Sequence, residues 1–142
     1  MQPSITFNLE DVPYPDGFKG QATTQWLLKV AQLEAKKIRE LHYFFCSDAH
    51  LYALNEKYLQ HSDFTDVITF PYNYDPIEAD IYISIDRISE NAMTYAKNDF
   101  LDELSRVVVH GLLHMCGYGD RSDEDKANMR SLELRYLSKR TT

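Results

Sequence analysis

The chain has 142 residues and a mass of 16.6 kDa, which is the size of one compact domain and leaves little room for two. Apolar residues make up 44% and aromatic residues 13% of it, a composition that excludes a disordered chain. The formal net charge of −7 excludes binding of nucleic acid through bulk positive charge, so a polyanionic substrate would need a local cation, a metal or a partner. We therefore predict one acidic globular domain over residues 1–142.

The periodicity of the first 70 residues predicts three strands separated by two helices. Apolar and polar residues alternate over 5–9, the run over 41–45 is typical of a buried strand, and residues 66–70 are typical of a third strand. Thr23 or Thr24 can cap the first helix. The expected apolar side of this helix is Trp26, Leu27, Val30, Leu33 and Ile38.

A second helix is expected to begin after Ser47, whose side chain can cap it, and a loop is expected over 60–64. Pro71 is expected to stop the third strand. A polar loop over 73–79 and a fourth strand over 80–85 follow. The short loop favours an antiparallel hairpin, whereas the two strand–helix–strand steps before it favour parallel pairing.

Three helices complete the chain, over 86–96, 101–115 and 122–137. The middle one is apolar on nearly all sides, which predicts a central, buried helix. Gly117 is placed to end it in a left-handed cap, and Ser122 can cap the last helix. The whole pattern predicts an α+β domain with a small mixed sheet.

The strongest chemical motif lies at the end of the central helix, in the segment HGLLHMCGYGD over 110–120. His110 and His114 are four positions apart, so their rings lie on one helix face, and Gly117 lets the chain turn so that Asp120 can return to the same point. Two imidazoles and a carboxylate that leave one position open are typical of a catalytic zinc site. We predict one divalent metal, with zinc as the first candidate, at His110, His114 and Asp120.

Gly111 occupies the position where HExxH zinc peptidases carry their general base, so the sequence argues against a peptidase. Glycine inside a helix costs about 1 kcal/mol relative to alanine. This cost predicts a close approach of another backbone or of substrate, with a tolerated glycine as the alternative interpretation. Further candidates for a metal ligand are Asp123, Asp125, His50 and His61.

The two cysteines, Cys46 and Cys116, lie far apart in apolar segments and form no CxxC pair. Free buried thiols are typical of a reducing compartment, and one disulfide between them is the alternative. The N-terminus shows no signal-peptide pattern, and no apolar run approaches the ~20 residues of a membrane helix. We therefore predict a cytoplasmic protein that makes no membrane contact.

Three further patterns follow one another along the chain: LN-x-x-Y over 54–58 with TDVITFP over 65–71, ADIYIS over 79–84, and the segment from Glu103 to Asp120. In this order they resemble the motifs of the YbeY family of metal-dependent endoribonucleases. The resemblance extends from about Leu41 to Leu137. It implies a zincin-like domain, in which about five helices flank a four-stranded mixed sheet around a central metal-binding helix.

The resemblance also implies cleavage of single-stranded RNA in late small-subunit ribosomal RNA maturation and ribosome quality control. The implied partners are ribosomal RNA, the small subunit and its assembly factors, and no DNA substrate is expected. A non-catalytic ribosome-assembly factor with a structural metal site is the alternative function. Asp80 is a candidate for a hydrogen bond to a ligand histidine. Tyr72 and Tyr74 are candidates for base stacking, with simple cover of the sheet edge as the alternative interpretation.

The chain departs from the family pattern at two positions. Asp120 stands where the family usually has a third histidine, which makes the site richer in oxygen. Leu59 stands where the family has an arginine thought to face the substrate, so a guanidinium suited to phosphate is missing. Arg106, Arg121 and His61 are candidates to supply that charge, although ordinary surface ion pairs also explain the arginines.

Overall fold

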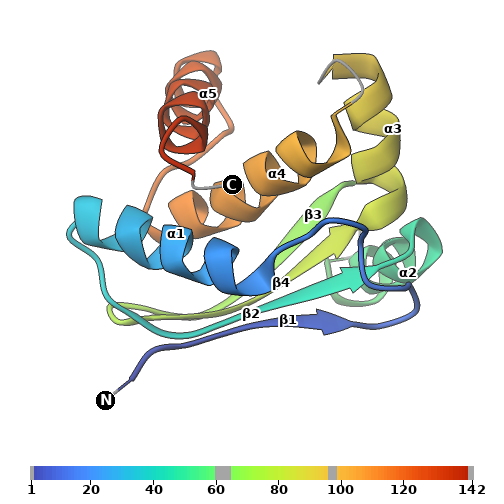
Figure 1. The fold of residues 1–142 in the computed structure, drawn as a ribbon, viewed down its shortest axis with the longest axis horizontal. Coiled ribbons are helices and arrows are strands. Elements are labelled where there is room, and N and C mark those ends of the chain that lie inside the picture. Colours follow the sequence, from blue (N-terminus) through green and yellow to red (C-terminus); the bar gives the residue numbers. More distant parts are fainter. Residues whose placement is uncertain (1, 60–64, 96–98, 141–142) are drawn as a thin grey trace.

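Four strands form one mixed sheet, and five helices pack around it in the part of the chain that the computed structural model describes, residues 2–59, 65–95 and 99–140 (Figure 1). The strands are β1 (Ser4–Leu9), β2 (Ile38–Cys46), β3 (Val67–Tyr74) and β4 (Ile77–Ser84). The helices are α1 (Gly20–Leu33), α2 (Asp48–Leu59), α3 (Ile85–Tyr95), α4 (Phe100–Met115) and α5 (Asp123–Leu137). The predicted α+β architecture is confirmed, whereas the loop predicted over 60–64 lies outside the described residues.

The strand order is β1-β2-β4-β3, with β1 and β4 parallel to β2 and with β3 antiparallel to β4. The first strand–helix–strand step is therefore parallel, as predicted, but the parallel pairing expected for the second step is wrong. The reason is burial, because Ile77, Ile81 and Ile83 are fully buried and make β4 the better central strand. The more polar β3 takes the edge, where it lines the pocket described below.

Pro71 does not stop the third strand, which continues to Tyr74. At the sheet edge one row of N–H groups has no partner strand, so a proline is tolerated there, and the register shifts between Pro71 and Asn73. The loop predicted over 73–79 is also shorter than expected, because Tyr74 already pairs with Ile77. The result is a tight hairpin that sets β3 firmly against β4.

Helix α1 runs from Gly20 to Leu33, so it begins before the threonines that were expected to cap it and ends before Ile38. It ends in a Schellman motif, in which Lys36 N–H donates to the Ala31 carbonyl at 2.8 Å and Ala35 has a φ of 57°. No glycine marks this left-handed residue, which is why the sequence pattern extended the helix. Ile38 belongs to β2.

Helix α4 is the central helix that the sequence predicted, in contact with α1, α3, α5 and the sheet (Figure 1). Its side chains Leu104, Val108, Val109, Leu112 and Leu113 are fully buried in the main core. Helix α2 covers the opposite face of the sheet with a smaller core of Cys46, Leu51 and Ile68. Among the helices that the structure describes, none combines the length and apolarity needed to cross a membrane.

Both cysteines are free, as predicted, although only Cys46 is fully buried and Cys116 is partly exposed. Burial raises the pKa of the Cys46 thiol to about 12 and that of Cys116 to about 11. Both side chains are therefore protonated near neutral pH, which makes them poor nucleophiles.

Gly111 is required by contact with β4. A Cβ atom at this position would lie 2.7 Å from Cδ1 and 3.2 Å from Cγ2 of Ile81, which is fully buried. The close approach predicted from the sequence is therefore present, but the neighbour is a side chain rather than a backbone or substrate. Position 111 faces the sheet, so this helix offers no place there for a peptidase base.

We expect Gly111→Ala to lower the free energy of unfolding by about 1–2 kcal/mol, because overpacking by one methyl group outweighs the gain in helix propensity. Urea unfolding measures the change. Ile81→Val removes the nearest atom, Cδ1, so the double variant should be more stable than the sum of the two single losses predicts. Strictly additive losses would contradict this explanation of Gly111.

Candidate metal centre

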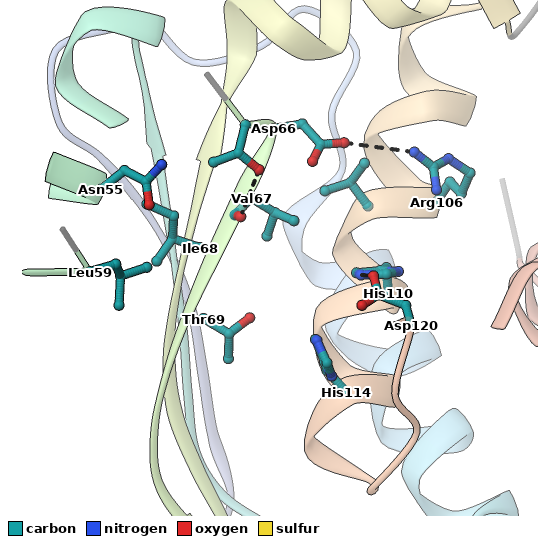
Figure 2. A pocket seen from close by; sticks show the side chains of 12 residues that line it. Asn55, Leu59, Asp66, Val67, Ile68, Thr69, Arg106, His110, His114 and Asp120 are labelled. Atoms are coloured by element: carbon teal, nitrogen blue, oxygen red, sulfur yellow. Dashed lines mark hydrogen bonds and ion pairs between the residues drawn. The ribbon is translucent and has the colours of Figure 1, made fainter. Parts of the chain in front are cut away.

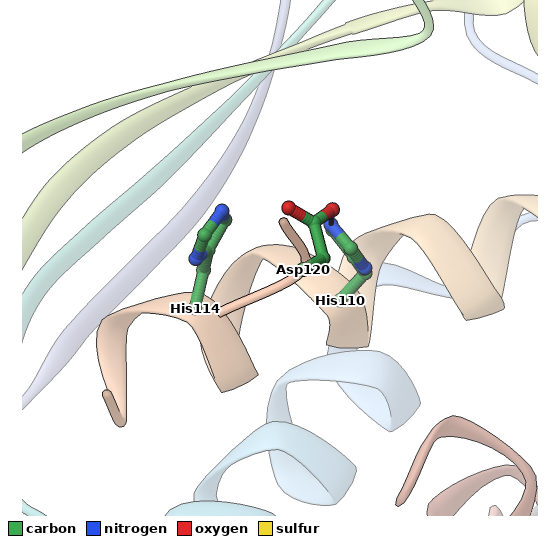
Figure 3. A group of neighbouring side chains, drawn as sticks. All are labelled: His110, His114 and Asp120. Atoms are coloured by element: carbon green, nitrogen blue, oxygen red, sulfur yellow. Dashed lines mark ion pairs between the residues drawn. The ribbon is translucent and has the colours of Figure 1, made fainter. Parts of the chain in front are cut away.

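The end of α4 brings three potential metal ligands together. Gly117 has a φ of 107°, and the N–H of Tyr118 donates to the Leu113 carbonyl at 3.2 Å, which completes a Schellman motif. This predicted left-handed cap is confirmed, and it turns the chain back so that Asp120 lies beside the helix. One ligand atom each from His110, His114 and Asp120 lies within 4.8 Å of the others (Figure 3).

In each of the two histidine rings, Nδ1 forms a hydrogen bond with another residue of the protein. His114 Nδ1 lies 2.9 Å from the Tyr118 carbonyl, and His110 Nδ1 lies 2.8 Å from Oε2 of Glu133. A carbonyl and a carboxylate can only accept, so Nδ1 is the donor of each ring, and the neutral form of such a ring has its lone pair on Nε2. His110 Nε2 also lies 3.5 Å from Oδ2 of Asp120. The tautomers are therefore those required for metal binding through Nε2.

Glu133 belongs to a network of buried charges behind the histidines. Arg106 donates two hydrogen bonds to Glu103, at 2.9 and 2.7 Å, and one to Glu133 at 3.1 Å. Burial alone would raise the pKa of Glu133, but the hydrogen bond from His110 and the positive charge of Arg106 lower it below its ordinary value. Glu133 is thus a carboxylate near neutral pH.

The three candidate ligands line a pocket of about 530 Å³ between α4 and the edge strand β3 (Figure 2). Arg106, His110 and His114 form one wall together with Asp120. The other wall comes from β3 and the end of α2. Its members are Asn55, Leu59, Thr65, Asp66, Val67, Ile68 and Thr69.

The remaining candidate ligands do not join this group. Asp123 and Asp125 are exposed at the start of α5 and stand outside the cluster of three. His50 lies near Tyr82, with ring centres 6.5 Å apart, on the face of the sheet opposite α4. His61 lies outside the described residues.

Of the side chains predicted to contact substrate or to support a ligand histidine, some line the pocket and others lie elsewhere. Arg106 lines the pocket, whereas Arg121 is exposed and does not line it. Asp80 accepts a hydrogen bond from the Tyr72 hydroxyl at 2.9 Å, on the α2 side of the sheet. Asp80 therefore does not contact a ligand histidine, and Tyr72 does not line the pocket, because side chains alternate faces along a strand. Tyr74 is exposed and does not line the pocket either.

Sequence reasoning missed Glu133 altogether. It shares the buried side of α5 with Met129 and Tyr136, four residues before it and three after it. A charged residue at an apolar position of a helix is rare unless it is paired, and this pattern could have identified it.

The arrangement fits a divalent metal. Two imidazole nitrogens and one carboxylate oxygen converge, both rings have the required tautomer, and the pocket leaves the remaining side of the site accessible. Among the described residues no fourth His, Cys, Asp or Glu joins the group. Three protein ligands beside an open pocket are typical of catalytic rather than structural zinc sites.

Comparison with known proteins identifies the family. The family model described as Endoribonuclease YbeY matches residues 6–141. Endoribonuclease YbeY of Bacteroides thetaiotaomicron is 38% identical over 138 residues, which cover 96% of this chain and 99% of that protein. The protein of the same name from Flavobacterium psychrophilum is 49% identical over 109 residues, covering 76% and 77% of the two chains.

A solved structure agrees with the sequence matches. The solution structure of TM1509 from Thermotoga maritima superimposes with a TM-score of 0.61 at 27% identity, covering 95% of this chain and 87% of that one. Because the family model matches residues 6–141 and the relatives agree in sequence and fold over nearly the whole chain, the chain belongs to the YbeY family of endoribonucleases.

Proposed function

We propose that the chain is a metal-dependent endoribonuclease that cuts single-stranded RNA. It acts in the cytoplasm in late small-subunit ribosomal RNA maturation and in ribosome quality control, and residues 1–142 form one domain. Its partners are ribosomal RNA, the small subunit and its assembly factors, and DNA is not a substrate. The observation that carries the proposal is the convergence of His110, His114 and Asp120 in a pocket of a YbeY-family fold.

His110 and His114, through Nε2, and Asp120, through a carboxylate oxygen, hold one divalent metal. A bound metal at such a site lowers the pKa of water and offsets negative charge on phosphate. The protein's own contribution is orientation, because a hydrogen bond from Nδ1 fixes each ring. Zinc suits two imidazoles and one carboxylate, and the oxygen ligand also makes Mn²⁺ acceptable.

The position of the site supports a single-stranded substrate. The His110 side chain is only 14% exposed and lies inside the recess between α4 and β3. A phosphodiester bond must enter this recess to reach it. A flexible single strand can bend into the recess, whereas a duplex holds its backbone in a fixed helical path.

The charge of the pocket supports a role for the metal in binding as well as in cleavage. Among the described residues that line it, Asp66 and Asp120 are acidic and Arg106 is the only lysine or arginine. Arg106 is already paired with Glu103 and Glu133. Without a metal this recess repels phosphate, so metal removal is expected to weaken RNA binding too.

A non-catalytic ribosome-assembly factor remains the second candidate, favoured by Leu59 at the position of the family arginine and by the net charge of −7. In that function the metal would be structural. Structural zinc sites are usually closed by four protein ligands. The main core of this chain contains none of the three candidate ligands.

Cleavage of matched substrates by zinc-loaded protein tests the proposal. We expect cleavage of a single-stranded RNA, but not of its RNA duplex or of single-stranded DNA with the same sequence. Chelation should abolish cleavage and added Zn²⁺ should restore it, while circular dichroism shows that the metal-free protein stays folded. Unchanged cleavage in chelator would refute metal dependence.

The same assay separates the two candidate functions. Zinc-loaded protein that cuts no RNA at all, including a precursor of small-subunit ribosomal RNA, would favour the assembly factor. Unfolding upon chelation would indicate that the metal is structural. Cleavage within the ribosomal precursor at a defined position would support the maturation role.

A further inference from the structure

The carboxylate of Glu133 joins the candidate metal site to α5. Glu133 is only 2% exposed, and its two oxygens have different partners. Oε2 accepts a hydrogen bond from Nδ1 of His110 at 2.8 Å, while Oε1 lies 3.1 Å from Nη1 of Arg106 and 3.6 Å from Nη1 of Arg130. The carboxylate that accepts the hydrogen bond from His110 is therefore itself fixed by ion pairs with two arginines.

Arg106 is in turn fixed by a second buried carboxylate, that of Glu103. Its Nε and Nη2 donate to the two oxygens of Glu103 at 2.9 and 2.7 Å, and Glu103 is 4% exposed. Its Nη2 also lies 3.8 Å from Asp66 in the pocket wall. An unpaired buried carboxylate would be costly, so Arg106 is what allows Glu133 to remain charged next to His110.

We propose that Glu133 is the positioning residue of the metal site, fixing the tautomer and orientation of His110 and strengthening its Nε2 as a ligand, with Arg106 holding Glu133. This inference rests on the proposed metal-dependent function. A charged acceptor on a ligand histidine raises the basicity of the ring, and loss of such a partner commonly weakens metal binding.

The two ligand histidines differ in this respect. His114 donates to the neutral backbone carbonyl of Tyr118, at 2.9 Å, so no side-chain substitution removes its acceptor. His110 depends on one side chain from a helix that begins after the metal motif. The proposal also assigns Arg106 to Glu133 and Glu103, rather than to substrate phosphate in place of the arginine missing at Leu59.

Zinc affinity of four proteins tests the proposal: the wild type, Glu133→Gln, Glu103→Gln and Glu124→Gln. Glu103 contacts Arg106 but makes no hydrogen bond to His110, so Glu103→Gln perturbs the buried charges without removing the acceptor. Glu124 is exposed on α5 and controls for the change in net charge. Competition with a chromophoric chelator measures zinc affinity, and thermal unfolding of the metal-free proteins measures stability.

We expect Glu133→Gln to bind Zn²⁺ about 10–100-fold more weakly than the wild type. The visible spectrum of bound Co²⁺ should also shift, because the ligand field at His110 changes. Glu103→Gln should lower the unfolding temperature while leaving zinc affinity and the Co²⁺ spectrum close to those of the wild type. Glu124→Gln should change none of these properties.

Wild-type zinc affinity and Co²⁺ spectrum in Glu133→Gln would overturn the positioning role while leaving the metal-dependent function in place. Equal losses of affinity in Glu133→Gln and Glu103→Gln would overturn it as well, because the effect would then be one of general stability. A wild-type protein that binds neither ion would refute both the inference and the proposed function.

Discussion

Replacement of His114 with alanine is expected to abolish both metal binding and RNA cleavage while the fold is retained. The His114 ring lines the pocket and is only partly buried, and among the described residues it hydrogen-bonds to the Tyr118 carbonyl alone. The apolar core of α4 is therefore untouched by the substitution. Two remaining donors, His110 and Asp120, are too few to hold a metal at a catalytic site, which normally has three protein ligands.

Metal content by mass spectrometry, on protein purified without a metal-affinity tag, measures the first effect. We expect about one zinc per chain in the wild type and none in His114→Ala or Asp120→Ala. His50→Ala is the matched control, since His50 lies on the opposite face of the sheet. Cleavage by His114→Ala with no metal bound would contradict the proposed mechanism, whereas a metal-free wild type would leave the histidines without a ligand role.

Leu59→Arg is expected to strengthen binding of single-stranded RNA by about tenfold, because one charge-assisted hydrogen bond to phosphate contributes roughly 1.5–3 kcal/mol before ordering costs. The Leu59 side chain lines the pocket wall opposite α4 and is 42% exposed. An arginine at this lining position would add a guanidinium that lacks the carboxylate partners of Arg106, Glu103 and Glu133. The affinity should also fall more steeply with salt, by roughly 0.7 in the logarithmic slope.

Fluorescence anisotropy with a non-hydrolysable RNA analogue measures this gain. Leu33→Arg provides the control, because Leu33 is 49% exposed on α1 and does not line the pocket. A similar gain in both variants would mean that net charge alone is responsible. An unchanged affinity in Leu59→Arg would show that phosphate does not pass along the α2 wall.

Local patterns predicted most of the elements, because a helix or strand face repeats over a few residues. The apolar periodicity of 101–115 identified the central helix, and Gly117 identified its end, since a left-handed residue favours glycine. At the end of α1 the left-handed residue is Ala35 rather than a glycine, so the sequence pattern did not mark the end and the predicted helix was too long. The prediction that the third strand ends at Pro71 was wrong, because the strand lies at the edge of the sheet, where a proline is tolerated.

The amino-acid pattern alone was enough to predict the metal motif, because a spacing of four residues on a helix and a glycine turn are local geometry. It could not determine that β4 would insert between β2 and β3, that α2 would bring Leu59 to the pocket, or that Asp80 would face away. It also did not reveal the 2.8 Å bond from His110 to Glu133, 23 residues away. Such contacts arise when whole elements pack, and packing depends on the summed burial of every face rather than on any short stretch of chain.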